Sequence, residues 1–154
     1  MIELLYLLRI GLSCLLGLII GLEREQADKP AGLRTILFII LGATLTVIFS
    51  LKFVKDTSAL NINYDAIRAI AYYLVAIGFV GGGIIGRKQG KIEGITTASL
   101  LLPVSIIGFL CGLGDYSLAI VATLIIYLIL KLKYIKIKIQ VMKKRKNNVK
   151  KTKS

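Results

Sequence analysis

The chain has 154 residues, of which 56% are hydrophobic, with a mean hydropathy of +0.78 and a formal net charge of +13. A soluble domain must cover itself with polar groups, so this composition indicates an integral membrane protein. The absence of histidine excludes zinc sites and catalytic machinery built on that residue. Nucleic-acid binding is a rival explanation of the charge, but a basic tail directly after a membrane helix more often meets anionic lipid headgroups.

Five apolar runs are long enough to cross, or nearly cross, a bilayer with a hydrocarbon core about 30 Å thick. The last run is short for a span, but the stems of its terminal lysines extend it to the interface. The predicted helices lie at about 4–22, 35–53, 66–86, 95–113 and 116–132. The sequence therefore predicts an all-α integral membrane protein, with a transmembrane domain over 1–130 and a basic tail over 131–154.

The basic residues between the predicted helices indicate the orientation, because lysine and arginine are retained on the cytoplasmic side. They gather in segments 23–34 and 87–94 and in the tail, which holds eleven of the 21 lysines and arginines. The connections on the other side of the membrane carry few basic residues. We therefore expect the N-terminus outside, the C-terminus in the cytoplasm, and anionic lipid at the basic tail.

A short internal similarity relates the first two predicted helices to the next two. GLIIG at 17–21 resembles GGIIG at 82–86, and AGLRT at 31–35 resembles EGITT at 93–97. Such matches also arise by chance in apolar chains, but both pairs fall at equivalent topological positions. They predict a parallel repeat of two-helix units, of the type that some transporters use to build a central site.

Several glycines are spaced so that they share a face of a predicted helix. Glycine lets neighbouring backbones approach closely, so we expect the first and third helices to pack against each other. A dimer interface is one alternative, and an ion path lined by carbonyl groups is another if the third helix breaks. The glycines concerned are Gly17, Gly21, Gly78, Gly81, Gly82 and Gly83.

A polar cluster follows the first predicted helix and forms the candidate functional site at the cytoplasmic face. Its members are Glu23, Arg24, Arg34, Thr35, Thr96 and Thr97. We expect Arg34 to pair with Glu23, and the threonines to cap helix starts or to donate hydroxyl groups to the cluster. A solvated loop that only sets topology is the structural alternative. Arg9, in the first helix, is expected to extend to the outer interface as an anchor.

The order of these motifs resembles the membrane domain of the MgtC/SapB family of bacterial inner-membrane proteins. The resemblance covers about residues 4–130 and rests on GLIIGLERE, AGLRT, GFVGGGIIGRKQGKIEGITTAS and IGFLCGLGDY. The matching positions are Gly17, Gly21, Glu23 and Arg24; Gly32, Arg34 and Thr35; Gly78, Phe79, Gly81 and Gly83; and Gly94, Thr96, Thr97 and Ala98. Two departures are Leu102, where members commonly carry tryptophan, and the segment after the last predicted helix, where we expect a basic tail in place of the cytoplasmic α/β domain with which many members continue.

Family resemblance implies a multi-pass protein of the bacterial inner membrane with a role in magnesium limitation, membrane homeostasis and, in pathogens, virulence. No phosphate-binding loop or aspartyl-phosphate motif is present, so we expect neither an enzyme nor a cofactor. Our leading hypothesis is a regulator of another membrane protein, such as a membrane ATPase, and the chain could also form a homo-oligomer. The alternatives are a small magnesium transporter or channel, for which Glu23 and Glu25 are the candidate Mg²⁺ carboxylates, and a scaffold whose charges serve only assembly.

Overall fold

The computed structural model describes residues 2–57, 65–88 and 90–132, and nearly all of these residues are helical. Helix α1 spans Ile2–Gln26, α2 Leu33–Thr57, α3 Ala66–Ile84 and α4 Ile95–Leu113. A shorter apolar helix, the C-terminal helix, covers Tyr116–Leu132. The first four are long and apolar enough to cross a membrane. Within the described ranges the predicted all-α membrane architecture of five helices is confirmed. Of the basic tail expected over 131–154, residues 131 and 132 are helical and the rest lies outside the described ranges.

Two boundaries differ from the expected ones in ways that affect the site. Helix α1 continues past residue 22 to Gln26, which places Glu23 and Arg24 on the helix and not in a loop. Helix α3 ends at Ile84, because the chain then forms an antiparallel hairpin of β1 (Gly86–Lys88) and β2 (Lys91–Glu93) where a loop was expected. Gly90 supplies the positive φ of 78° that a tight hairpin turn requires.

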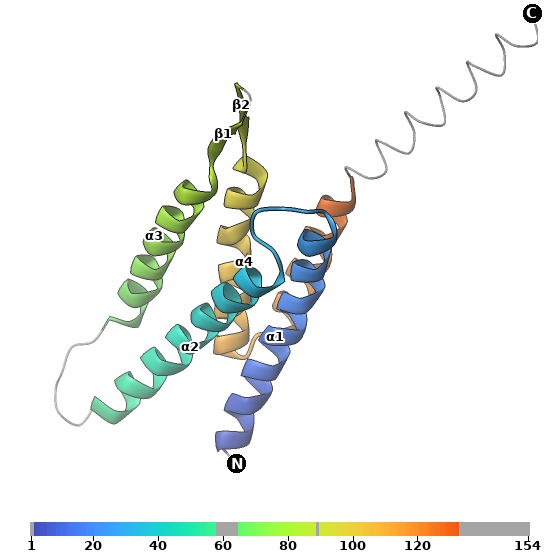
Figure 1. The fold of residues 1–154 in the computed structure, drawn as a ribbon. Helices are drawn as coiled ribbons and strands as arrows, with labels where there is room; N and C mark the ends of the chain where they lie inside the picture. Colours follow the sequence, from blue (N-terminus) through green and yellow to red (C-terminus); the bar gives the residue numbers. More distant parts are fainter. Residues whose placement is uncertain (1, 58–64, 89, 133–154) are drawn as a thin grey trace, which may run out of the picture.

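Figure 1 shows α2 and α4 in the centre of the bundle, with α1 on one side and α3 on the other. Aliphatic side chains of α1, α2, α4 and the C-terminal helix form the main core. Its largest fully buried members are Ile20, Ile36, Ile40, Leu101 and Ile107. Helix α3 is peripheral, since only 11% of its span is buried, against 56% for α4.

The closest contact between central helices is made by two glycines of α4 that the sequence analysis did not single out. A Cβ atom on Gly108 would lie 2.5 Å from the carbonyl oxygen of Ile40, and one on Gly112 would lie 2.7 Å from Cβ of Val47. Thr44 Oγ1 shares its hydrogen between the carbonyl oxygens of Gly108 and Ile40, each 2.9 Å away. A pair of glycines spaced by four residues thus allows α2 and α4 to approach within hydrogen-bonding distance.

The predicted packing of the first helix against the third is wrong, because α2 and α4 lie between them. Gly17 and Gly21 instead face α2, where added Cβ atoms would meet the side chains of Ile40 and Leu33. Gly81 contacts α4. The other three glycines expected to pack have no described atom within 4 Å of an added Cβ: Gly78, Gly82 and Gly83. Helix α3 is continuous across them, so the break that a carbonyl-lined ion path required is not found.

The proposed repeat agrees with the structure in one of its two motifs. Both Gly32 and Gly94 directly precede a helix, α2 and α4 respectively. The segment at 17–21, however, lies inside α1, whereas 82–86 runs across the end of α3 into β1. The repeat therefore stays a prediction.

Arg9, which we expect to act as an anchor at the outer interface, contacts the end of α4. Its Nη1 donates a hydrogen bond of 2.7 Å to the carbonyl oxygen of Gly112, in the last turn of α4. That helix ends at Gly114, where φ is 90° and the amides of Gly114 and Asp115 both bond to the carbonyl oxygen of Leu110. A cation at a helix C-terminus is favourable, so Arg9 ties α1 to the end of α4.

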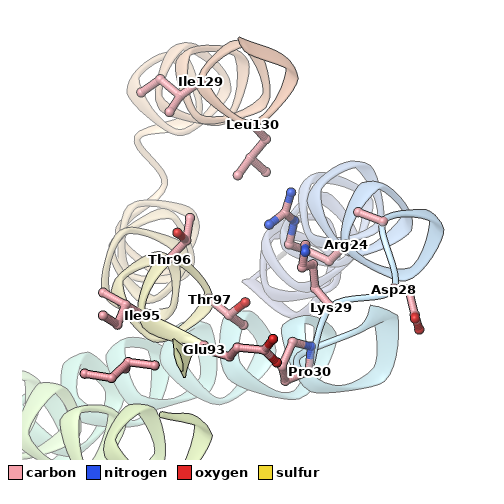
Figure 2. Close-up of a pocket in the computed structure, with 13 residues that line it drawn as sticks. Arg24, Asp28, Lys29, Pro30, Glu93, Ile95, Thr96, Thr97, Ile129 and Leu130 are labelled. Atoms are coloured by element: carbon pink, nitrogen blue, oxygen red, sulfur yellow. The ribbon is translucent and has the colours of Figure 1, made fainter. Parts of the chain in front are cut away.

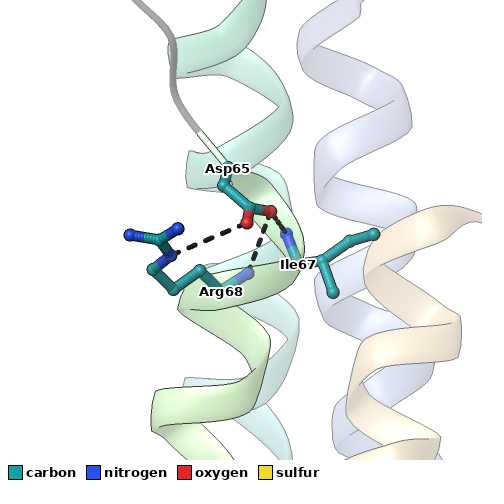
Figure 3. Close-up of polar contacts among 3 residues, drawn as sticks. All are labelled: Asp65, Ile67 and Arg68. Atoms are coloured by element: carbon teal, nitrogen blue, oxygen red, sulfur yellow. Dashed lines mark hydrogen bonds and ion pairs between the residues drawn. The ribbon is translucent and has the colours of Figure 1, made fainter.

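The alternation of helices places the α1–α2 connection, the β hairpin and the end of the C-terminal helix at one end of the bundle (Figure 1). This is the end that the basic residues assign to the cytoplasm. At the opposite end Asp65 begins α3 by accepting hydrogen bonds from the amides of Ile67 and Arg68, at 3.0 and 3.2 Å (Figure 3). Nε of Arg68 also lies 3.6 Å from Oδ2 of Asp65, and this exposed ion pair contributes little stability.

Candidate functional site

Glu23 and Arg24 form a buried ion pair in the last turn of α1. Their exposed fractions are 3% and 4%, and Arg24 contacts Glu23 Oε2 through both Nε and Nη2. Successive helical residues do not face each other, so both side chains must bend to meet. Buried charges require such pairing. The expected partner, Arg34, is exposed instead, and the prediction of a Glu23–Arg34 pair is wrong.

The pair leaves two polar groups unused. Glu23 Oε1 is buried and has no hydrogen-bond partner. Because both recorded contacts of the Arg24 guanidinium end on Glu23 Oε2, its Nη1 is also left without a hydrogen bond among the described residues. The site therefore holds a charged donor that the protein itself does not satisfy.

Glu25, the second candidate magnesium ligand, has a structural role. Its Oε2 accepts a hydrogen bond of 2.8 Å from the amide of Leu33, the first residue of α2. Gly32 makes this approach possible, since a Cβ there would meet the same carboxylate. The described residues contain no group of three or more histidine, cysteine, aspartate or glutamate side chains that could hold a metal. One oxygen of each candidate is engaged by the protein, Oε2 of Glu23 by Arg24 and Oε2 of Glu25 by Leu33, and a Mg²⁺ site at these two carboxylates stays a prediction.

A pocket of about 1060 Å³ opens beside the ion pair, between the end of α1, the start of α4 and the end of the C-terminal helix (Figure 2). The Arg24 guanidinium is directed into this space, opposite Leu130. Of the six predicted site residues, the pocket lining includes Arg24, Thr96 and Thr97 but not Glu23, Arg34 or Thr35. The remaining lining residues are Ala27, Asp28, Lys29, Pro30, Ile92, Glu93, Gly94, Ile95, Ile129 and Leu130.

The start of α4 contributes backbone donors to this pocket. The N-cap is Gly94, with φ of 90° and no side-chain cap, and the first amide bonded to it is that of Ala98. The three preceding amides, those of residues 95–97, have no acceptor within the helix. Thr96 and Thr97 lie inside this first turn, so the expectation that they cap the helix is wrong. Thr35 does not cap α2 either, because it lies inside that helix, and the amide of the first residue, Leu33, bonds to Glu25.

Sequence reasoning missed several lining residues, and for a physical reason. Lys29 was interpreted only as a determinant of topology, and Ile129 and Leu130 only as part of the last apolar run. Their place beside Arg24 depends on the C-terminal helix returning next to α1, which no local pattern encodes.

Fold and site together define a multi-pass helical membrane protein with a polar pocket at one end of its bundle. A sequence profile of the MgtC family matches residues 10–136, and the chain belongs to this family. It is similar to Protein MgtC of Salmonella typhimurium, with 36% identity over 121 residues, or 79% of this chain and 49% of that protein. It is also similar to Protein SapB of Bacillus subtilis, with 34% identity over 122 residues, or 78% of this chain and 53% of that protein.

An uncharacterized protein of Haemophilus influenzae is 34% identical over 124 residues, covering 79% of this chain and 52% of that protein. The chain thus spans about half the length of the curated relatives it matches. No solved structure matches the chain. The departure at Leu102 does not distort α4, which is continuous through Pro103 from Ile95 to Leu113.

Proposed function

We propose that the chain is a non-enzymatic regulator in the inner membrane of a bacterium, acting on another membrane protein, such as a membrane ATPase, during magnesium limitation. The pocket at the cytoplasmic end is its working site. Family membership, together with the four helices long and apolar enough to cross a membrane, supports the membrane setting.

The observation that carries the proposal is the buried Glu23–Arg24 pair that borders the pocket. Removing two charges from water is costly, and well-packed apolar residues often replace such pairs without loss of stability. Stability alone therefore gives little reason to place a pair here. Ionisable groups buried in membrane proteins instead commonly mark functional sites.

The distribution of carboxylates favours regulation over transport. All eight acidic residues lie in terminal turns of helices or in the connections between them. A secondary transporter normally binds its substrate near the bilayer midplane, where this chain has no carboxylate. At this end of the bundle, Oε2 of Glu23 contacts Arg24 and Oε2 of Glu25 accepts the amide of Leu33.

Two measurements test the proposal together. Purified protein in liposomes loaded with a magnesium-sensitive dye should show no protein-dependent Mg²⁺ entry. In cells that lack the protein, the wild-type chain should restore growth at low magnesium, whereas Arg24→Ala, which leaves Glu23 buried without its partner, should not. The matched control is Arg87→Ala, which removes the same charge from an exposed position at the same end of the bundle.

The comparison requires that Arg24→Ala and Arg87→Ala be present in the membrane in equal amounts. Mg²⁺ flux that is abolished by Glu23→Gln would establish the transporter alternative. Full growth with both charges of the pair neutralised, as in Glu23→Gln combined with Arg24→Gln, would instead support a scaffold whose charges serve only assembly.

A further inference from the structure

We infer that the pocket binds the phosphate group of a membrane phospholipid headgroup, held by Arg24 and the first amides of α4. This deepens the proposed function, since it names the ligand class of the same site.

The start of α4 has the geometry of an anion site. Gly94 leaves the amides of residues 95–97 without helical acceptors, and all three residues line the pocket. The N-terminus of a helix also carries a partial positive charge, so a phosphate oxygen there gains both hydrogen bonds and a favourable dipole. The hydroxyl groups of Thr96 and Thr97 add two further donors on the same wall.

Arg24 is the independent observation that points to a ligand. Only 4% of Arg24 is exposed, and its side chain is directed into the pocket. Its Nη1 has no hydrogen bond among the described residues. A planar guanidinium with a free donor matches the geometry of a phosphate oxygen. Glu23 holds the other side of the guanidinium and so fixes the direction of Nη1.

Two acidic residues, Asp28 and Glu93, also belong to the lining. Figure 2 shows the carboxylate of Asp28 directed away from the pocket and that of Glu93 directed toward Pro30. Lys29 lies next to Arg24 and adds a second cation on the same wall. The lining thus holds two cations and two carboxylates, and Arg24 and Lys29 are the cationic donors on the side of the pocket that faces the start of α4.

The opposite wall favours a lipid over a soluble phosphate. Ile129 and Leu130 belong to an apolar helix that reaches this end of the bundle, and Ile95 extends the apolar surface on α4. A pocket of about 1060 Å³ is larger than a phosphate ion needs and falls at the upper end of the range for sites that hold organic ligands. A headgroup with the start of its acyl chains matches both walls.

Binding of short-chain lipids to delipidated protein in detergent, followed by native mass spectrometry, tests the inference. The probes are dioctanoyl phosphatidylglycerol, dioctanoylglycerol, which lacks the phosphate, and inorganic phosphate, which lacks the chains. We expect the phospholipid to bind at least about tenfold more tightly than either of the other two, as loss of a charge-assisted contact predicts.

The variants distinguish this pocket from lipid held elsewhere on the helices. Arg24→Gln combined with Glu23→Gln removes the donor without leaving a lone buried charge, and should weaken phospholipid binding about tenfold. Lys29→Gln and Thr96→Val, on the pocket wall but outside the buried pair, should each weaken it severalfold and serve if the double variant does not fold. Arg87→Gln, which removes an exposed charge near the pocket but not in its lining, should leave binding unchanged.

Equal binding of dioctanoylglycerol would overturn phosphate recognition. Equal binding of inorganic phosphate would overturn the lipid as its source. Phospholipid binding that is the same in wild type and in all pocket variants would place the lipid elsewhere and also overturn the inference. Mg²⁺ flux in the liposome assay would defeat the proposed regulatory function without affecting any of these binding results, so the two failures are distinguishable.

Discussion

The contact between α2 and α4 predicts that one chemical change has opposite effects at two glycines. In Gly108→Ala, the new methyl group would lie 2.5 Å from the carbonyl oxygen of Ile40 and 2.6 Å from Cβ of Ala43. Neither atom can rotate away, so the helices must separate and the hydrogen bond from Thr44 to the Gly108 carbonyl must lengthen.

Overpacking of this kind costs about 1–3 kcal/mol, and weakening the hydrogen bond costs about 1 kcal/mol more. Alanine recovers about 1 kcal/mol through its higher helix propensity. Gly108→Ala should therefore lower the free energy of unfolding by about 1–3 kcal/mol. Gly82→Ala is the matched control, because no described atom lies within 4 Å of its new methyl group. It should be neutral or stabilising by up to about 1 kcal/mol.

The assay is titration of detergent-solubilised protein with sodium dodecyl sulfate, followed by far-ultraviolet circular dichroism, since the chain has no tryptophan. Gly108→Ala should unfold at lower denaturant than wild type, and Gly82→Ala at the same or higher. If Gly108→Ala proves as stable as Gly82→Ala, the helices do not approach as closely as described. If Gly82→Ala is instead the destabilised variant, the glycine face of α3 is packed against something.

Three further outcomes follow from contacts at the helix ends. Arg9→Gln should lower the free energy of unfolding by about 1.5–3 kcal/mol through loss of the charge-assisted bond to Gly112, and an unchanged denaturation midpoint would contradict that role. Glu25→Ala should cost about 0.5–2 kcal/mol, because the Leu33 amide loses its cap, and thermal melts with and without Mg²⁺ should show the same loss. Gly94→Ala should destabilise the start of α4, because φ of Gly94 is 90° and the new Cβ would lie 2.3 Å from the carbonyl oxygen of Ile84 in α3. The expected readout is faster amide hydrogen exchange at the start of α4 than in wild type.

The helices themselves were predictable because each depends on a long local run of apolar residues. The expected range 95–113 coincides with α4, and the last expected helix is helical over Tyr116–Leu132, where the described residues end. The end of α1 was not predictable to the same degree. In a sequence, the charges of Glu23 and Arg24 indicate the end of a membrane-spanning helix. In the structure α1 continues through them, because the two side chains form an ion pair inside the protein.

The candidate site was predicted in composition but not in its contacts. Local motifs identified Glu23, Arg24 and Thr97, and the structure places all three at one end of the bundle. Pairing with Arg34 failed because the side chain of a residue at a helix start can point to solvent, and its direction depends on how α1 and α2 cross. The role of Glu25 at the start of α2 depends on the same crossing.

The sequence alone determined that this chain is a multi-pass helical membrane protein, because hydrophobic length and charge placement are properties of segments taken one at a time. It also located the polar residues near one end. Only the tertiary structure decided which glycines pack, since Gly108 and Gly82 have similar local surroundings but face α2 and open space respectively. It likewise decided that Arg24 borders a pocket closed by Leu130, because a site between helices exists only once their order in space is set.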